Sequence, residues 1–230
     1  ALELFRLQPQ RIVVLGGPGV VSDQVANSLQ TYTTTNTVDR LAGSGRYETA
    51  AAVSQAVFPE ADSVFIANGV SFTDALAGGA AAAANNAPML LVSDVGVPSV
   101  TGAELARLAP STIYLLGGES IISPTTAAAL SGYLAPGGEI VRLAGLDRYQ
   151  TAVAISTSFA AEGGTVYLAT GQDFPDALAA APVAGLQDAP ILLLPQSSGL
   201  NAATRDEILR LEPSKIVILG GLGVINAAQE

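Results

Sequence analysis

Short apolar runs recur along the chain, and stretches with helical spacing separate them. Each run has four to six residues, is bounded by Gly, Pro or Asn, and lacks regular alternation of apolar and polar positions, as in Val64–Ala67 and Ile113–Leu116. This pattern is typical of strands that are buried on both faces of a parallel sheet. Between the runs, apolar residues recur at helical spacing, as at Ala50, Val53 and Val57. The alternation predicts βαβ units with right-handed crossovers, which place helices on both faces of each sheet.

Most of these runs belong to an internal repeat. The stretch Arg40–Ala50 recurs 102 residues later as Arg142–Ala152, with 8 of its 11 positions unchanged. Three further motifs recur in the same order: Val64–Gly69 as Val166–Gly171, Phe72–Ala77 as Phe174–Ala179, and Ala87–Val92 as Ala189–Leu194. A fifth motif, an apolar run followed by Leu-Gly-Gly, occurs three times, ending at Gly17, Gly118 and Gly221. Such repeats indicate tandem copies of one supersecondary unit.

Each unit is predicted to have four strand–helix steps, which gives an α/β fold of tandem small modules, each with a four-stranded, mostly parallel sheet. The strands are expected at about 38–43, 63–67, 88–92 and 112–116 in the first full copy and at about 140–144, 165–169, 190–194 and 215–219 in the second. A predicted helix over 2–7, strand over 11–15 and helix over 22–31 match only the last part of a unit.

The repeat therefore divides the chain into three expected regions. Residues 1–35 form the C-terminal part of a preceding module, 36–136 a first full module, and 137–230 a second module whose last helix is truncated. The half-unit at the start implies either a longer array or units that are closed by neighbouring chains.

Residues at the strand–helix junctions support this register. Ser22, Ser123 and Asn226 occupy the same place in the three Leu-Gly-Gly copies, and each is a good N-cap, as is Asp147 in the second Arg-Leu-Ala-Gly motif.

Tight turning and close helix–strand packing account for the paired glycines, namely Gly16, Gly17, Gly117, Gly118, Gly220 and Gly221. Although Gly16-Gly-Pro-Gly19 is similar to a phosphate loop, it does not complete a dinucleotide fingerprint. Asp74 and Asp176 follow Ser71 and Asp173 by three residues, which suits the first turn of a capped helix.

The composition excludes several classes of site. The net charge is −10, and the one Lys and nine Arg form no run, which argues against a nucleic-acid groove and a basic membrane-surface helix. No apolar run approaches the roughly 20 residues of a membrane-spanning helix. Without Cys there are no disulfides, thiolate ligands or Cys nucleophile, and without His there is no Ser-His-Asp chemistry and no imidazole ligand. The sequence therefore predicts neither a cofactor nor a metal site.

Four motifs in one order, present twice, carry a family resemblance. Arg-Leu-Ala-Gly-x-x-Arg-Tyr-x-Thr-Ala, Phe-x-Asp-Ala-Leu, Ala-Pro-Ile-Leu-Leu and Ile-x-x-Leu-Gly-Gly resemble the cell-wall-binding repeat type 2 family over about 40–230, with the last motif also at 12–22. The resemblance implies Toprim-like modules, often three per protein, in a surface protein of Gram-positive or related bacteria or of some archaea. It implies an extracellular location at the cell wall and non-catalytic, non-covalent anchoring to an anionic wall polymer or polysaccharide.

The resemblance also points to candidate ligand-binding residues. The family's Pro-Ile-Leu-Leu motif is tied to anchoring, and here it comprises Pro190, Ile191, Leu192 and Leu193, with Pro88, Leu90 and Leu91 in the first copy, where Met89 replaces Ile. As an alternative, these side chains are sheet core and influence anchoring through stability.

Arginines and tyrosines near the helix starts are the polar candidates. An anionic polymer could bind locally through Arg40, Arg46, Arg142 and Arg148, or through a divalent cation. Arg46 and Arg148 lie near helix N-termini, whose N–H groups also attract anions, but they could instead bridge to a carboxylate or to strand-end carbonyls. Tyr47 and Tyr149 could stack on a sugar or pack under the turn with a bonded hydroxyl.

Two further function classes stay open beside the wall anchor. A structural building block of a surface layer or filament, with self-association as its partner mode, is suggested by the unfilled sheet of the half-unit. A hydrolase would use Asp176 with another carboxylate. However, Asp173 of the second copy is Ser71 in the first, and the Asp-x-Asp pair of metal-dependent Toprim enzymes does not occur.

Overall fold

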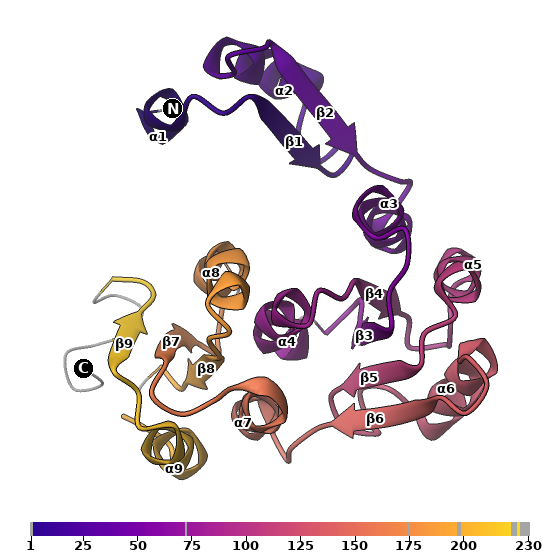
Figure 1. Cartoon of the computed structure of the whole chain (residues 1–230), viewed down its shortest axis with the longest axis vertical. Helices are drawn as coiled ribbons and strands as arrows, with labels where there is room; N and C mark the ends of the chain where they lie inside the picture. The colour runs from indigo at the N-terminus through magenta and orange to yellow at the C-terminus, as the bar shows by residue number, and fades with distance from the viewer. Residues whose placement is uncertain (1, 72, 174, 197–198, 222–224, 226–230) are drawn as a thin grey trace. The chain divides into compact units, whose positions relative to one another are not determined.

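A computed structural model of the chain describes residues 2–71, 73–173, 175–196, 199–221 and 225. The chain divides into two compact units, residues 1–57 and residues 58–230 (Figure 1). The strands pair in parallel in every sheet that the described residues form, as the unalternating apolar runs predict.

The first unit contains a two-stranded sheet and short helices. β1 (Arg11–Leu15) pairs with β2 (Thr37–Leu41). The helical elements are α1 (Leu2–Leu7), α2 (Asp23–Leu29), the 3-10 turn η1 (Gln30–Tyr32) and α3 (Arg46–Val57). The predicted cap of α2 is confirmed, because the Ser22 hydroxyl accepts the N–H of Val25 at 3.3 Å.

The second unit begins with a four-stranded sheet in the order β4-β3-β5-β6. Its strands are β3 (Ser63–Asn68), β4 (Met89–Val92), β5 (Thr112–Leu116) and β6 (Glu139–Leu143). The intervening helices are α4 (Thr73–Ala84), α5 (Ser99–Leu108) and α6 (Pro124–Leu130), with the 3-10 turn η2 (Ser131–Tyr133). Ser123 caps α6 by accepting from Thr126 at 3.1 Å, and Pro124 is its first residue, both as predicted.

A second sheet in this unit has the order β8-β7-β9. It is built from β7 (Thr165–Thr170), β8 (Ile191–Leu194) and β9 (Lys215–Ile218), with α7 (Arg148–Phe159), α8 (Pro175–Leu186) and α9 (Ala202–Leu211). The predicted N-cap of α7 is confirmed by a 2.8 Å bond from the Gln150 N–H to Asp147. The helix predicted after Asn226 lies outside the described residues.

The sheets and the sequence repeat are offset by one strand. Every expected strand exists within about two residues of its predicted bounds. However, β6, the first strand of the second copy, pairs with β5 of the first, and β2 pairs with β1. The expected grouping of 38–43 with 63–67 in one sheet is therefore corrected, and the second copy supplies three strands of a sheet within the described residues instead of four. A periodic sequence sets the repeat length but not the point in the period at which a sheet begins.

Small residues let the two sheets of the second unit share one core. α4, α7 and α8 fill the space between the sheets, and α5 and α6 cover the opposite face of the four-stranded sheet (Figure 1). α4 and α8 approach each other closely at Gly185. A Cβ added to this glycine would lie only 2.2 Å from the Cβ of Ala83. Such contact is possible only where side chains are minimal. The packing of α4, α7 and α8 places the carboxyl ends of the first sheet beside the start of α7.

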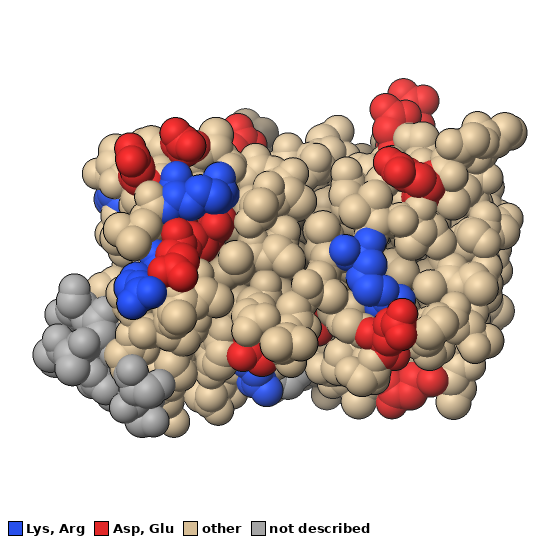
Figure 2. Space-filling model, turned by 90° about the horizontal axis from the view of Figure 1, so that it is seen from below, with Lys and Arg blue, Asp and Glu red and all other residues tan. Residues whose placement is uncertain are grey.

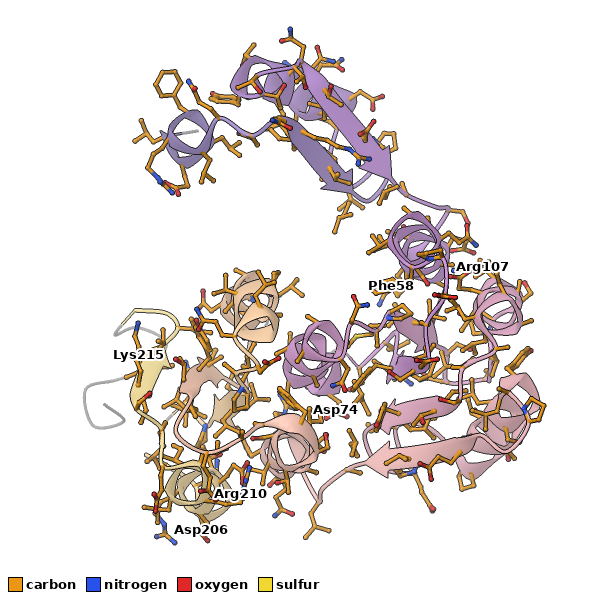
Figure 3. All side chains as sticks on the ribbon, in the orientation of Figure 1. Phe58, Asp74, Arg107, Asp206, Arg210 and Lys215 are labelled. Atoms are coloured by element: carbon orange, nitrogen blue, oxygen red, sulfur yellow. The ribbon has the colours of Figure 1, made fainter. Side chains whose placement is uncertain are left out.

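Arg107 secures the start of the same unit. Its guanidinium donates to the carbonyl oxygens of Phe58 and Pro59, each at 2.7 Å, and pairs with the buried carboxylate of Glu104 at 2.6 Å (Figure 3).

None of the helices in the described part of the chain has the length and apolar character that crossing a bilayer requires.

Candidate functional site

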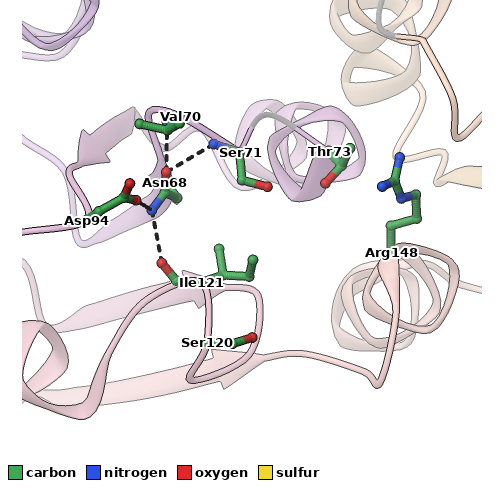
Figure 4. A pocket seen from close by; sticks show the side chains of 8 residues that line it. All are labelled: Asn68, Val70, Ser71, Thr73, Asp94, Ser120, Ile121 and Arg148. Carbon is green, nitrogen blue, oxygen red and sulfur yellow. Dashed lines mark hydrogen bonds between the residues drawn. The ribbon is translucent and has the colours of Figure 1, made fainter.

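A cavity of about 440 Å³ opens at the carboxyl edge of the four-stranded sheet (Figure 4). β3 is the first strand of this sheet, β4 lies on one side of it and β5 on the other, so the strand order reverses between β3 and β5. In open parallel α/β sheets, ligands bind at this kind of switch point, beyond the carboxyl ends of the strands. The lining residues are Asn68, Val70, Ser71, Thr73, Asp94, Ser120, Ile121 and Arg148.

Asn68, the last residue of β3, ties together the three loops around the cavity. Its amide nitrogen donates to Asp94 Oδ1 at 2.8 Å and to the carbonyl oxygen of Ile121 at 2.9 Å. Its amide oxygen accepts the N–H groups of Val70 at 2.7 Å and Ser71 at 3.0 Å. Both donors and both acceptor sites of the amide are therefore used, which fixes the side chain and the loops that it joins.

Asp94 lies in a tight turn at one end of the cavity. The main chains of Ser93 and Gly96 exchange two hydrogen bonds of 3.0 and 3.1 Å, and the Ser93 hydroxyl also donates to the Gly96 carbonyl at 3.0 Å. Gly96 has φ +132°, a backbone conformation that a side chain would disfavour. The turn and Asn68 together hold an exposed carboxylate at a defined place.

Arg148 lies at the other end, opposite Asp94 (Figure 4). It is the first residue of α7, and one of its N–H groups donates to the carbonyl oxygen of Gly171, just after β7. This close approach needs a glycine, because a Cβ at Gly171 would lie 2.8 Å from the Tyr149 ring and 3.2 Å from Arg148 Cδ. A guanidinium has five N–H donors, so the bond to Gly171 orients the group without exhausting it.

A buried carboxyl, Asp74, lies in the first turn of α4 (Figure 3). It is only 6% exposed and packs against the turn after β5, where a Cβ on Gly117 would lie 2.5 Å from Asp74 Oδ2. Burial raises the pKa of this carboxyl, and the positive charge of Arg148 opposes part of that rise. Asp176 occupies the corresponding place in α8 and is half-buried, while Phe72 and Phe174 of the same motif lie outside the described residues.

The first arginine of each Arg-Leu-Ala-Gly motif donates hydrogen bonds to carbonyl oxygens of a Leu-Gly-Gly turn. Arg40 donates to the Gly16 carbonyl at 2.6 Å, and Arg142 donates to the carbonyls of Gly117 at 2.7 Å and Ile122 at 2.9 Å. Arg40 also pairs with Asp23 at 3.2 Å. The sequence suggested bonds to strand-end carbonyls for Arg46 and Arg148, whereas here Arg40 and Arg142 make such bonds, and neither of these two guanidinium groups lines the cavity.

The paired glycines of these turns are not equivalent. The first of each pair has positive φ, +102° at Gly16, +105° at Gly117 and +107° at Gly220. At the second position, an added Cβ on Gly17, Gly118 or Gly221 would meet no atom closer than 3.9 Å in the described structure. The turn therefore requires glycine at the first position of each pair.

The other predicted polar candidates are spread over both units. Arg46 is exposed and Tyr47 half-buried in the first unit. Tyr149 is half-buried against the central core, and its hydroxyl accepts a 3.1 Å bond from Gln172 Nε2. This agrees with the packed alternative for that ring and leaves Arg148 as the predicted ligand residue that faces the cavity.

The Pro-Ile-Leu-Leu motifs are core. Leu90, Leu192 and Leu193 are fully buried, and Ile191 is 1% exposed. Pro88 and Pro190 are buried as well, and Leu91 is half-buried against the central core. In this fold these side chains contact their own sheet and helices, which favours the alternative that they influence anchoring through stability.

Most residues of the cavity carry no local sequence signal that marks them as a site. Asn68, Asp94 and Ser120 are not predicted as site residues, because Asn68 ends β3, Asp94 and Ser120 follow two other strands, and no local spacing connects the three. One signal in the sequence could have indicated these positions. The second repeat has Thr170 in place of Asn68 and Gln196 in place of Asp94, although the surrounding motifs are similar.

Charged residues make up 13% of the chain. Figure 2 shows Lys and Arg side chains beside Asp and Glu on one face of the molecule, within a largely uncharged surface. Six ion pairs of arginine with a carboxylate occur within the described residues. No group of three or more Asp or Glu that could hold a metal ion is found in the described ranges.

Comparison with curated proteins identifies partial relatives in Bacillus subtilis (strain 168). The chain is 31% identical over 191 residues to N-acetylmuramoyl-L-alanine amidase LytC, covering 83% of this chain and 38% of the relative. It is 34% identical over 158 residues to Amidase enhancer, covering 67% of this chain and 21% of the relative. The chain thus spans less than half of the length of these relatives.

Solved structures and a family model match as well. Cwp8 from Clostridium difficile superposes with a TM-score of 0.82 at 24% identity, covering 97% of this chain and 37% of that one, which shows a shared fold. Cwp6 from the same organism gives 0.75 at 26% identity, covering 82% and 30%. The model of the cell wall binding domain 2 (CWB2) family matches residues 40–127 and 142–230. Since these matches take in both repeats and most of the chain, the protein belongs to the cell wall binding domain 2 family.

Proposed function

We propose that the chain anchors a surface protein to an anionic cell-wall polymer and that the cavity beside Arg148 receives an anionic unit of that polymer. Family membership assigns wall binding to the repeats. The observation that carries the finer proposal is the guanidinium of Arg148 at a sheet switch point, oriented by Gly171 and surrounded by hydroxyl and amide groups. A positioned guanidinium is well suited to phosphate or carboxylate.

Local recognition is needed because the chain as a whole repels anions. Its net charge is −10, and the arginines beyond the cavity include six that already pair with a carboxylate in the described structure. Exposed charges more than about 8–10 Å apart are largely screened at physiological salt. A polymer unit seated next to Arg148 would therefore be governed by the cavity and much less by the distant carboxylates.

The proposal involves binding without a chemical step. Glycoside hydrolysis ordinarily uses two carboxylic groups that flank the scissile bond. Asp94 is the sole carboxylate among the described residues that line the cavity, and one of its oxygens accepts the Asn68 amide. Together with the absence of His and Cys from the sequence, this supports a non-catalytic anchor. The parent protein would then act outside the cell, at the wall.

Co-sedimentation with isolated cell walls tests the proposal. Arg148→Ala should weaken wall binding by about tenfold or more, because it removes a charge-assisted contact, whereas Arg205→Ala makes the same charge change at an exposed position of α9. Arg148→Lys keeps the charge without the planar fork and should give an intermediate result. Soluble polymer and high salt should release the wild-type chain from the walls.

Each variant is first checked for native thermal unfolding, because Arg148 also bonds to Gly171. A folded Arg148→Ala chain that binds walls as tightly as the wild type would refute the assignment of the cavity. Equal binding to walls that have been stripped of their anionic polymer would refute the choice of polymer.

A second candidate function is a building block of a surface layer. Within the described residues β9 pairs with β7 alone, whereas the equivalent strand β5 has partners on both sides, and Ile216 on β9 is 45% exposed. Unpaired strand edges can recruit another chain. Light scattering over a wide concentration range tests this function, and a strictly monomeric chain would exclude it.

A further inference from the structure

We propose that the cavity selects a hydroxyl-rich unit that carries its own anionic group, as an acidic sugar or a sugar phosphate does, with the anion at Arg148 and the hydroxyl groups donating to Asp94. The inference rests on the proposed function and adds the chemical class of the bound unit. It follows from the opposite charges at the two ends of one cavity (Figure 4).

The Asp94 end disfavours a simple anion. Its carboxylate is exposed and held by the Ser93–Gly96 turn and by the amide of Asn68 at 2.8 Å. A carboxylate has about four acceptor sites and no donor, so the Asn68 bond leaves acceptors for further hydroxyl groups. Negative groups near it would be repelled, while neutral hydroxyls would be bound.

The Arg148 end attracts the anionic group of the same unit. Thr73, which begins the 12-residue helix α4, and Arg148, which begins α7, both line this end. A guanidinium binds carboxylate and phosphate through parallel N–H bonds. Asp94 and Arg148 bear opposite charges, so the lining as a whole offers a bare anion little net attraction.

The remaining lining fits a ring with hydroxyl groups. Ser71 and Ser120 supply hydroxyls that can both donate and accept, and Val70, 59% exposed, supplies an apolar patch at the opening. Ligand cavities that combine such patches with a few placed polar groups commonly measure about 300–1,000 Å³. The observed volume of about 440 Å³ suits a single small unit of a polymer.

The selectivity is confined to the first repeat. The second repeat has Gln196 at the position of Asp94, and a neutral amide replaces the carboxylate. It also has Thr170 at the position of Asn68, where the hydroxyl accepts the Gln172 N–H at 3.1 Å. A Thr hydroxyl offers one donor, so it cannot reproduce the two donated bonds of the Asn68 amide. The two repeats would therefore contribute unequally to polymer recognition.

Titration of the folded chain with four small probes, followed by NMR, tests the proposal. The probes are glucuronate, glucose 6-phosphate, inorganic phosphate and glucose. At least one of the two acidic sugars should bind about tenfold more tightly than phosphate and glucose, and the better of the two identifies the anionic group. Phosphate that binds as tightly as both acidic sugars would overturn the proposal.

Asp94→Asn is the decisive variant, because its side-chain oxygen can still accept the Asn68 bond while the second acceptor oxygen becomes a donor. It should weaken binding of the preferred acidic sugar about tenfold and leave phosphate binding unchanged or tighter. Asp62→Asn is the matched control, since Asp62 is exposed and precedes β3 at the opposite edge of the same sheet. Equal sugar affinities in the wild type and Asp94→Asn would overturn the role of Asp94.

The results separate this inference from the proposed function. If Arg148→Ala loses wall binding but Asp94→Asn keeps the wild-type preference among the probes, the anchor stands and the selectivity proposal fails. If the wall binding of folded Arg148→Ala is intact, the cavity is not the wall site and both proposals fail.

Discussion

Arg142 on β6 donates from Nη1 to the carbonyl oxygen of Gly117 at 2.7 Å, at the turn that follows β5. Its Nη2 donates to the carbonyl oxygen of Ile122 at 2.9 Å. The same turn carries Ser120 and Ile121, which line the cavity. The first arginine of the repeated motif thus holds one wall of the candidate site in place from the neighbouring strand.

Replacement of this arginine should destabilise the second unit. Arg142→Lys keeps the charge but cannot span both carbonyls with a planar fork, so we expect a loss of about 1–3 kcal/mol in the free energy of unfolding. Urea unfolding measures the loss. Arg205→Lys, at an exposed position of α9, is the control and should change stability by less than about 0.5 kcal/mol. A fully stable Arg142→Lys chain would mean that the two carbonyl bonds contribute little.

Substitution of Leu192 tests whether the Pro-Ile-Leu-Leu motif influences wall anchoring through the stability of the core. Leu192→Ala should cost about 2–5 kcal/mol, because the side chain is fully buried, whereas Leu209→Ala at a 66% exposed site should cost far less. Wall binding by the fraction that remains folded should be unchanged, as measured below the unfolding transition. Loss of binding by a demonstrably folded Leu192→Ala chain would instead indicate direct polymer contact.

The neighbouring glycines Gly117 and Gly118 should respond differently to alanine. Gly117 has φ +105°, and an added Cβ would lie 2.5 Å from Asp74 Oδ2 and 3.2 Å from Ile121. Gly117→Ala should therefore lower stability by at least about 2 kcal/mol. Gly118→Ala meets no atom within 4 Å and should change stability by less than about 1 kcal/mol. Thermal unfolding of the two variants compares them, and similar melting temperatures would refute the distinction.

Asp74 should make stability depend on pH. Burial raises the pKa of its carboxyl in the folded state, so the folded chain holds this proton more tightly than the unfolded chain does. The protonated group favours folding below the ordinary Asp pKa, and this contribution is lost as the pH rises through the folded-state pKa. Asp74→Asn keeps the group neutral and should be more stable than the wild type at neutral pH, with the difference shrinking in acid.

Urea unfolding between about pH 4 and 8 measures this effect. Asp62→Asn makes the same change in net charge at an exposed site and serves as the control. A stability difference between Asp74→Asn and the wild type that does not vary with pH, or that grows in acid, would contradict the assignment.

The elements themselves were readable from the sequence because they depend on local pattern. Apolar runs and helical spacing predicted each strand of the two repeats, and Ser22, Ser123 and Asp147 predicted three helix starts through hydrogen bonds to residues three positions away. The repeated motifs also led to the family, since they are contiguous stretches of residues. Arg148 was singled out because its motif recurs and its place near a helix start was predictable.

The tertiary structure decided which strands pair and which side chains share a cavity. Ladder bonds join main-chain groups that every strand has, so similar apolar runs such as those of β1, β5 and β9 do not specify their neighbours. The link between Asn68 and Ile121 spans 53 positions, and no local spacing connects Asp94 with Arg148. The amino-acid sequence therefore determined the repeating elements and the family, whereas packing of α4 and α7 against the sheet created the site, because its residues are neighbours only in space.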